Sequence, residues 1–237
     1  MRRRIDIGGL IDLALPRACA GCGLPGPSVC PDCVEDIAAT TFAGGPKPIL
    51  PWPAPRGLGP VCTAGAYSGA LASVIAGHKD AGRDDVRSLL ALLLARAIRA
   101  ARVPPDAVVV GLPSSPAATR RRGDAPVARL VAHAAAAGHL PAIDALRVSG
   151  RVRDAVGLSS AQRARNISGV MRASRDVAGQ VVVLADDIVT TGATMREAVR
   201  AIEAAGGVVV ARAAIAATPR RFREEQGESL HNGTEVS

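Results

Sequence analysis

The stretch VVVLADDIVTTGAT, residues 181–194, decides how the rest of the chain is interpreted. Its first four residues are apolar and mostly β-branched, which is typical of a buried parallel strand. The adjacent carboxylates of Asp186 and Asp187 are expected to end that strand. A short loop rich in hydroxyl groups comes next, and apolar residues at helical spacing predict a helix over 194–205. The stretch therefore predicts the order strand, acidic pair, loop, helix.

This order suits a sugar phosphate as ligand. A glycine-containing loop that opens a helix offers free backbone N–H groups and a positive dipole end to an anion. The expected phosphate-binding residues are Thr190, Thr191, Gly192, Ala193 and Thr194. Carboxylates accept hydrogen bonds from ribose hydroxyls, so we expect Asp186 and Asp187 to hold the sugar.

The same stretch resembles the phosphoribosyl-pyrophosphate (PRPP) binding signature of type I phosphoribosyltransferases. That resemblance implies a type I phosphoribosyltransferase fold, in which helices flank a parallel sheet, and catalytic roles for Asp186 and Asp187. The alternative is purely structural. A strand can end in solvated acids before a capped helix without binding a ligand.

Composition narrows the class of protein. Of 237 residues, 48% are hydrophobic but only 2% are aromatic, so the core must be built from aliphatic side chains. The net charge of +8 favours polyanionic partners, although a general compositional bias accounts for it equally well. No apolar run reaches the roughly 18–20 residues of a membrane span, so we expect a cytoplasmic protein.

Four cysteines near the amino terminus form a second group of functional residues. They are Cys19, Cys22, Cys30 and Cys33, with the spacing C-x2-C-x7-C-x2-C. Two-residue gaps let both thiolates of a pair face one ion, so the spacing predicts a small N-terminal four-cysteine zinc module with a structural Zn²⁺. Two redox-active cysteine pairs without a metal are the alternative interpretation.

The pattern along the chain predicts an α/β architecture in four parts. Residues 1–40 hold an N-terminal helix and the zinc module, 41–60 a Pro/Gly-rich linker, 61–219 the phosphoribosyltransferase-like domain, and 220–237 a disordered tail. Expected strands cover 61–67, 107–112, 143–148, 180–186 and 207–216. Expected helices cover 71–78, 84–101, 125–137, 159–166 and 194–205.

Basic residues in two further loops are candidates for contact with a pyrophosphate. Lys79 is one of only two lysines in the chain, and Arg121 and Arg122 follow the expected strand 107–112. Carboxyl ends of parallel strands meet at one edge of a sheet, so these loops could face the acidic pair. A surface lysine at a helix end and a solvated arginine run are the alternatives.

The chain also resembles the ComF competence proteins, which join a four-cysteine zinc module to a phosphoribosyltransferase domain. The resemblance covers residues 15–218. It rests on the cysteine spacing, Tyr67 with Gly69, the loop 79–83, Pro113 with Arg121, Arg122 and Gly123, the run Leu158, Arg163, Asn166 and Gly169, and the loop 186–194. It implies a role in DNA uptake during natural transformation or in single-stranded DNA handling. Single-stranded DNA and DNA-uptake proteins are then the implied partners, beside PRPP or a related ribose phosphate.

Two functions stay open at this level, beside the less specific interpretation of a structural assembly protein whose zinc module docks on a partner. In the first, the chain is a phosphoribosyltransferase of nucleotide metabolism that displaces pyrophosphate from PRPP with the help of Mg²⁺. In the second, the same pocket binds PRPP without turnover while arginines hold single-stranded DNA. The shortage of aromatic rings favours the second, because few side chains can stack on a base.

Overall fold

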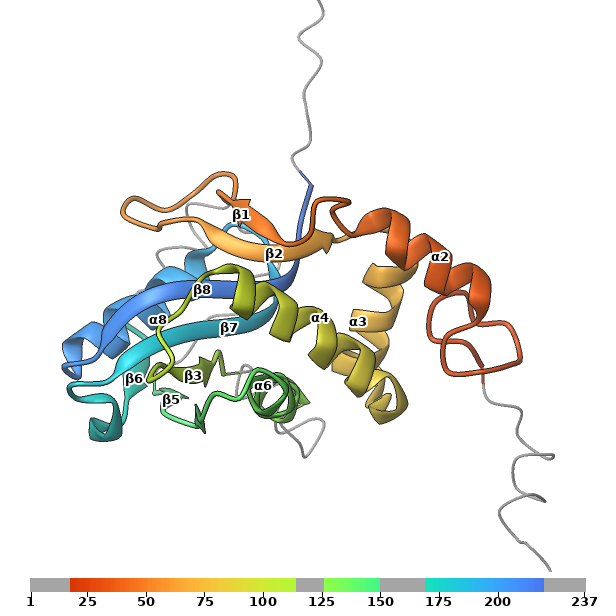
Figure 1. The fold of residues 1–237 in the computed structure, drawn as a ribbon. Coiled ribbons are helices and arrows are strands. Elements are labelled where there is room, and N and C mark those ends of the chain that lie inside the picture. The colour runs from red at the N-terminus through yellow and green to blue at the C-terminus, as the bar shows by residue number, and fades with distance from the viewer. Residues whose placement is uncertain (1–17, 114–125, 150–168, 220–237) are drawn as a thin grey trace, which may run out of the picture.

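The structure is a computed structural model that describes residues 18–113, 126–149 and 169–219. Its centre is a six-stranded sheet in the order β1-β2-β8-β7-β3-β4, parallel except for the edge strand β1 (Figure 1). The strands are β1 (Lys47–Ile49), β2 (Val61–Ala66), β3 (Val108–Gly111), β4 (Ala142–Ile143), β7 (Val181–Val189) and β8 (Val208–Ala217). The central pair, β7 and β8, is buried on both faces for most of its length, which explains the continuous apolar runs of these strands.

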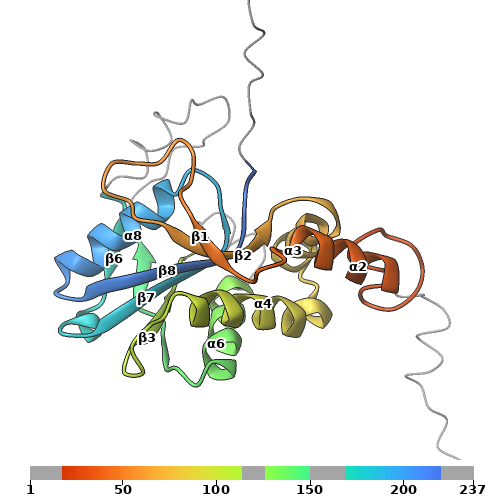
Figure 2. The same cartoon turned by 45° about the horizontal axis from the view of Figure 1, so that its top comes forward.

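Helices cover both faces of this sheet. On one face lie α4 (Arg87–Ala100) and α6 (Pro126–Ala137), and on the other lies α8 (Ala193–Ala204) (Figures 1 and 2). Each face has its own aliphatic core. The expected α/β fold, with a mostly parallel sheet flanked by helices, is therefore confirmed.

The four cysteines and α2 (Pro31–Thr40) form a small N-terminal unit beside α3 (Gly69–Ala81) (Figure 2). Asp36 of α2 accepts a hydrogen bond of 2.5 Å from the N–H of Ala70, in the first turn of α3. Ser68, the N-cap of α3, makes no side-chain cap of its own. A carboxylate from the cysteine unit therefore supplies the cap that this helix lacks.

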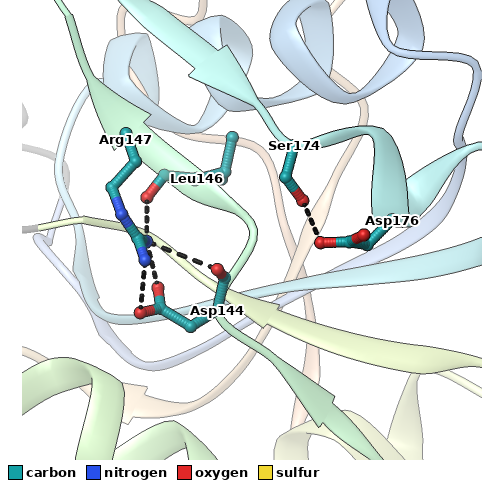
Figure 3. Close-up of polar contacts among 5 residues, drawn as sticks. All are labelled: Asp144, Leu146, Arg147, Ser174 and Asp176. Carbon is teal, nitrogen blue, oxygen red and sulfur yellow. Dashed lines mark hydrogen bonds and ion pairs between the residues drawn. The ribbon is translucent and has the colours of Figure 1, made fainter.

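A two-stranded antiparallel sheet, β5 (Leu146–Val148) with β6 (Met171–Ala173), lies next to α8. Hydrogen bonds between residues close in sequence stabilise its turns. Arg147 forms two hydrogen bonds, of 2.5 and 2.9 Å, to the carboxylate of Asp144, and Ser174 donates one of 2.8 Å to Asp176 (Figure 3). Residues 150–168, which connect the two strands, lie outside the described residues, as does the expected helix 159–166.

Four expected elements differ from the observed ones. The helix expected over 71–78 is α3, Gly69–Ala81, so Lys79 lies in a helix and not in the expected loop. The strand expected to end at Asp186 continues to Val189, because β8 extends alongside it and pairs Ala217 with Val189. The single strand expected over 143–148 is two strands in two different sheets. The helix expected over 84–101 begins with a 3-10 turn, Asp84–Val86, before α4.

The Pro/Gly-rich segment 41–60, expected to be a linker, contributes β1 to the main sheet. Pro48 lies opposite Cys62 of β2, at the outer edge of the sheet. An edge strand tolerates proline because its outward backbone positions need no N–H donor. The expected N-terminal helix and the tail 220–237 fall outside the described residues. No helix in the described part of the chain combines the length and the hydropathy that crossing a membrane requires.

Candidate functional site

The acidic pair, Asp186 and Asp187, lies in the second half of the central strand β7. The N–H of Asp187 donates a hydrogen bond of 2.9 Å to Oδ1 of Asp186, so the two carboxyl groups belong to one cluster. Asp187 is only 2% exposed. Lys79, near the end of α3, places its Nζ 3.0 Å from Asp187 Oδ1 and 2.9 Å from Oδ2. Two residues predicted separately from the sequence therefore form one ion pair.

Burial and charge shift the titration of this cluster. Burial raises the pKa of Asp186 well above its ordinary value, and the negative charge of Asp187 raises it further, while Lys79 opposes the shift. Burial alone would lower the pKa of Lys79, but the carboxylates of Asp187 and Asp186 outweigh it and raise the value. Lys79 is therefore charged at neutral pH and partly neutralises the acidic pair.

His78, which precedes Lys79, was not singled out by sequence reasoning. It is buried, and its Nε2 has no hydrogen-bond partner in the described part of the chain. Burial lowers the pKa of His78, although Asp84 and Asp187 act in the opposite direction. The imidazole is therefore neutral at pH 7 and leaves the Lys79–Asp187 pair without a competing cation.

The TTGAT loop, residues 190–194, joins the acidic pair to helix α8. Gly192 is the N-cap residue and has φ 75°, in the left-handed region that favours glycine. A Cβ on Gly192 would lie 2.2 Å from Cδ2 of Leu58. Conformation and space both require glycine at this turn.

Backbone donors at the start of α8 are open to a ligand. The N–H of Ala193 makes only a long contact of 3.4 Å with Thr191 Oγ1, and the first helical hydrogen bond runs from Arg196 N–H to Gly192 O. Within the described residues, the N–H groups of Thr194 and Met195 have no backbone acceptor. The loop thus combines free N–H groups, threonine hydroxyls and the positive end of a twelve-residue helix.

Residues 51–58 cover one side of this loop. Pro51 lies against Gly192, and Leu58, which is 6% exposed, packs into the core below α8. Arg196 of α8 donates a hydrogen bond from Nε to the carbonyl of Arg56. The segment 41–60 thus supports the candidate site as well as the edge of the sheet.

Glu197 of α8 anchors the small β5–β6 sheet, and sequence reasoning missed it. Its carboxylate accepts the N–H of Met171 at 2.9 Å and bonds to Arg200 at 2.7 and 2.8 Å. Arg200 also donates to the carbonyl of Met171 at 2.8 Å. Burial works against ionisation, but the hydrogen bonds from Arg200, Met171 and Gly169 prevail and lower the pKa of Glu197. The spacing of Glu197 and Arg200, three positions apart on an expected helix, is a sequence signal for their pairing.

The four cysteine sulfurs gather into one candidate metal site, with all four ligand atoms within 4.8 Å of one another. Cys22 Sγ and Cys30 Sγ lie 3.7 Å apart. Four sulfurs bound tetrahedrally at about 2.3 Å from Zn²⁺ would be about 3.8 Å apart, so the spacing fits this ion. Burial raises the pKa of Cys19, but N–H groups of the surrounding loop outweigh that effect and bring it to about 6. Those donors favour the thiolate that a metal requires.

A carboxylate in the turn before α4 contacts this cysteine unit. Arg83 bonds to both carboxylate oxygens of Asp85, at 2.8 and 2.7 Å. These bonds, a further one from Ser28 and the charge of Arg83 outweigh desolvation, so the pKa of Asp85 lies well below its usual range. Ser28 belongs to the loop between the cysteine pairs, so Asp85 ties that loop to the turn before α4.

The remaining predicted site residues, Arg121 and Arg122, fall outside the described residues. Among the described ones, the structure brings Lys79 to Asp187 and places the TTGAT loop directly after β7. It brings the four cysteines together as a separate group.

The parallel sheet and the acidic pair, followed by a loop that opens a helix, are accompanied by similarity to phosphoribosyltransferases. Residues 129–230 match the model of the phosphoribosyl transferase domain. The chain is 38% identical over 77 residues to an orotate phosphoribosyltransferase of Rhizorhabdus wittichii. That match covers 32% of this chain and 39% of the relative, so the chain spans about two fifths of the relative's length.

Two solved structures are also similar. One is described as an allosteric regulatory enzyme of purine biosynthesis, at 24% identity and a TM-score of 0.35, covering 56% of this chain and 25% of that one. The other is a glutamine PRPP amidotransferase from B. subtilis in complex with ADP and GMP, at 26% identity and a TM-score of 0.34. The match covers 52% of this chain and 24% of the amidotransferase.

Proposed function

We propose that this chain binds PRPP, or a related ribose phosphate, at the carboxyl end of β7. The observation that carries the proposal is the continuity of the site. The acidic pair of β7 and the loop of open N–H donors follow one another directly in the chain, and Lys79 of α3 forms an ion pair with the buried Asp187. Together they present acceptors to sugar hydroxyls and donors to a phosphate.

Each group has a role set by its chemistry. The N–H groups and hydroxyls of the TTGAT loop bind the 5′-phosphate, and the acidic pair accepts hydrogen bonds from the ribose 2′- and 3′-hydroxyls. Lys79 is the nearest described cation for the pyrophosphate, with Arg121 and Arg122 as further candidates. Mg²⁺, a cation that prefers oxygen ligands, would neutralise the charge of the pyrophosphate when it is bound.

Calorimetric titration of the protein with PRPP and Mg²⁺ tests the proposal. Asp187→Asn should weaken binding at least tenfold, because the substitution removes the charge that fixes Lys79 and an acceptor for ribose. The matched control is Asp176→Asn, since this carboxylate bonds only locally to Ser174. Equal affinities for wild type and Asp187→Asn would overturn the assignment.

A phosphoribosyl transfer reaction is the second candidate, supported by the match to the phosphoribosyl transferase domain. In that reaction an acceptor displaces pyrophosphate from the anomeric carbon, and the acidic pair stabilises the developing positive charge on the ribose. Pyrophosphate release across a panel of bases and amines tests it. Release that requires one acceptor and disappears in Asp187→Asn supports an enzyme, whereas PRPP binding without release supports a binding protein.

We also propose a cytoplasmic role in DNA uptake or single-stranded DNA handling, as the ComF resemblance implies. Its support is the four-cysteine site joined to a phosphoribosyltransferase-type domain, together with the net charge of +8. Binding driven by phosphate contacts must weaken steeply as salt rises. A titration of labelled single-stranded DNA at several salt concentrations measures this, and binding that ignores salt would contradict the proposal.

A further inference from the structure

A cavity of about 360 Å³ lies at the edge of the sheet opposite to the acidic pair. It is formed by the end of α4, the turn 103–105 that leads into β3, and the end of α6. This end of α4 lies on the side of the sheet away from α2 and α3 (Figure 1). The cavity is therefore separate from the candidate ribose-phosphate pocket, which lies at the carboxyl ends of the strands.

The floor and one wall of the cavity are apolar. Ile98 and Ala95 form the floor and belong to the core between α4 and the sheet. Val103 and Leu140 add partly buried apolar surface. Leu92, which is 55% exposed, lies at the opening. A hollow with an aliphatic lining buries the hydrocarbon part of a ligand.

Three guanidinium groups surround the opening. We call this group, Arg96, Arg99 and Arg102, the basic rim. The three residues are spaced by three positions, so neighbours lie on the same side of the helix and its end, where like charges repel. None of the residues that line the cavity is acidic, and no ion pair within the described chain involves the rim. By contrast, the guanidinium groups of Arg83, Arg147 and Arg200 each hold a carboxylate.

Arg102 follows the end of α4 in a left-handed backbone conformation. Its φ is 53°, in the left-handed region that glycine adopts at lower cost. Attraction between arginines and the negative end of α4 explains cations at a helix terminus. It does not explain an aliphatic cavity beneath the three charges.

We propose that this cavity binds a small amphipathic anion, with its phosphate or carboxylate head on the basic rim and its apolar body against Ile98 and Ala95. An apolar cavity of about 150 Å³ accommodates the six carbons of benzene. A cavity of about 360 Å³ therefore takes roughly fourteen heavy atoms, which fits an apolar body of about ten carbons with its anionic head. Charge complementarity selects the head, because the rim offers donors and the cavity supplies no acceptor carboxylate. The ligand class is therefore a medium-chain alkyl or acyl anion.

Calorimetry with decyl phosphate, kept below its micelle concentration, tests the proposal. Decyl phosphate should bind at least tenfold more tightly than inorganic phosphate, which lacks the apolar body, and than decanol, which lacks the charge. Arg96→Gln/Arg99→Gln and, separately, Leu92→Glu should each reduce its affinity at least tenfold. Leu92, Arg96 and Arg99 are all exposed, so thermal unfolding should show that the variants remain folded.

Two controls locate the binding. Arg172→Gln, on the exposed side of β6, and Lys79→Met, at the other edge of the sheet, should leave decyl phosphate binding unchanged. Equal affinities for decyl phosphate, phosphate and decanol would overturn the proposal, as would a double variant that binds like wild type. A third outcome would also overturn it: wild type does not bind decyl phosphate but binds single-stranded DNA or an acidic peptide, and the double variant loses that binding. The rim would then be a surface for a macromolecule.

Discussion

Replacement of Lys79 by methionine isolates the electrostatic basis of the candidate site. The substitution keeps the aliphatic stem and removes the ammonium group that lies 3.0 and 2.9 Å from the carboxylate oxygens of Asp187. Asp187 is 2% exposed, so no solvent replaces the lost partner. The variant leaves two adjacent carboxylates in a buried strand without their cation.

The expected loss of stability depends on how far the two partners are exposed to solvent. Removal of one partner from a fully buried pair costs about 3–5 kcal/mol. The side chain of Lys79 is 35% exposed, so screening reduces this figure, and we expect Lys79→Met to lower the free energy of unfolding by about 2 kcal/mol at pH 7.5. For a chain of this size that corresponds to a fall in Tm of roughly 4–8 °C.

The pH dependence has a defined sign. The pKa of Asp186 is raised in the folded state, so its ionisation costs stability as the pH rises above the usual aspartate value of 3.8. Lys79 opposes that rise, so the variant has a larger penalty at neutral pH and a smaller one in acid. The difference in Tm between the two proteins should therefore shrink as the pH falls toward 4.

Differential scanning calorimetry from pH 4 to pH 8 measures both effects. Lys47→Met is the matched control, because Lys47 is the only other lysine and is exposed, with its Nζ 4.2 Å from the ring centre of Phe42. It should lower the free energy of unfolding by less than about 1 kcal/mol. Equal Tm values for Lys79→Met and wild type at pH 7.5 would refute the reasoning.

Three further substitutions test other parts of the structure. Gly192→Ala should destabilise the protein by about 2–4 kcal/mol and weaken PRPP binding, because glycine is required there by both φ 75° and close packing. Glu197→Gln should cost about 1–3 kcal/mol at pH 7 and speed hydrogen exchange at the N–H of Met171; because the pKa of Glu197 is lowered, the loss should diminish as the pH falls below 4.5. Gly21→Ala should reduce bound zinc below one ion per chain, since its Cβ would lie 2.5 Å from Sγ of Cys33.

Each of these variants has a direct control. Gly179→Ala has a similar φ of 73° but open space around its Cβ, so it should cost only the conformational strain, about 1 kcal/mol. Glu203→Gln, on the same helix as Glu197, should leave hydrogen exchange at Met171 unchanged. Gly44→Ala, with no atom within 4 Å, should retain full zinc content by metal analysis. A Gly21→Ala protein with one zinc ion per chain would contradict the proposed four-sulfur site.

The sequence predicts the fold because its information is local and periodic. Apolar runs followed by helical spacing place β3, β7, β8 and the helices between them, and the cysteine spacing indicates one compact cluster. The same local information sets the order of the acidic pair, the TTGAT loop and α8. These features depend on neighbours within a few residues, which a single sequence contains in full.

The contacts that complete the site join distant residues, and local patterns do not encode them. Lys79 and Asp187 are 108 positions apart, and Glu197 and Met171 are 26 apart. The extension of β7 to Val189 depends on its pairing with β8. The role of β1 depends on β2, because a three-residue strand with a central proline has no strand signal of its own.

A structure of the protein with PRPP and Mg²⁺ bound tests the central claim most directly. The account predicts the 5′-phosphate within hydrogen-bond distance of the N–H groups of Thr194 and Met195, and the ribose hydroxyls on Asp186 and Asp187. The claim would be contradicted if PRPP bound away from the TTGAT loop and contacted neither the Lys79–Asp187 pair nor the start of α8.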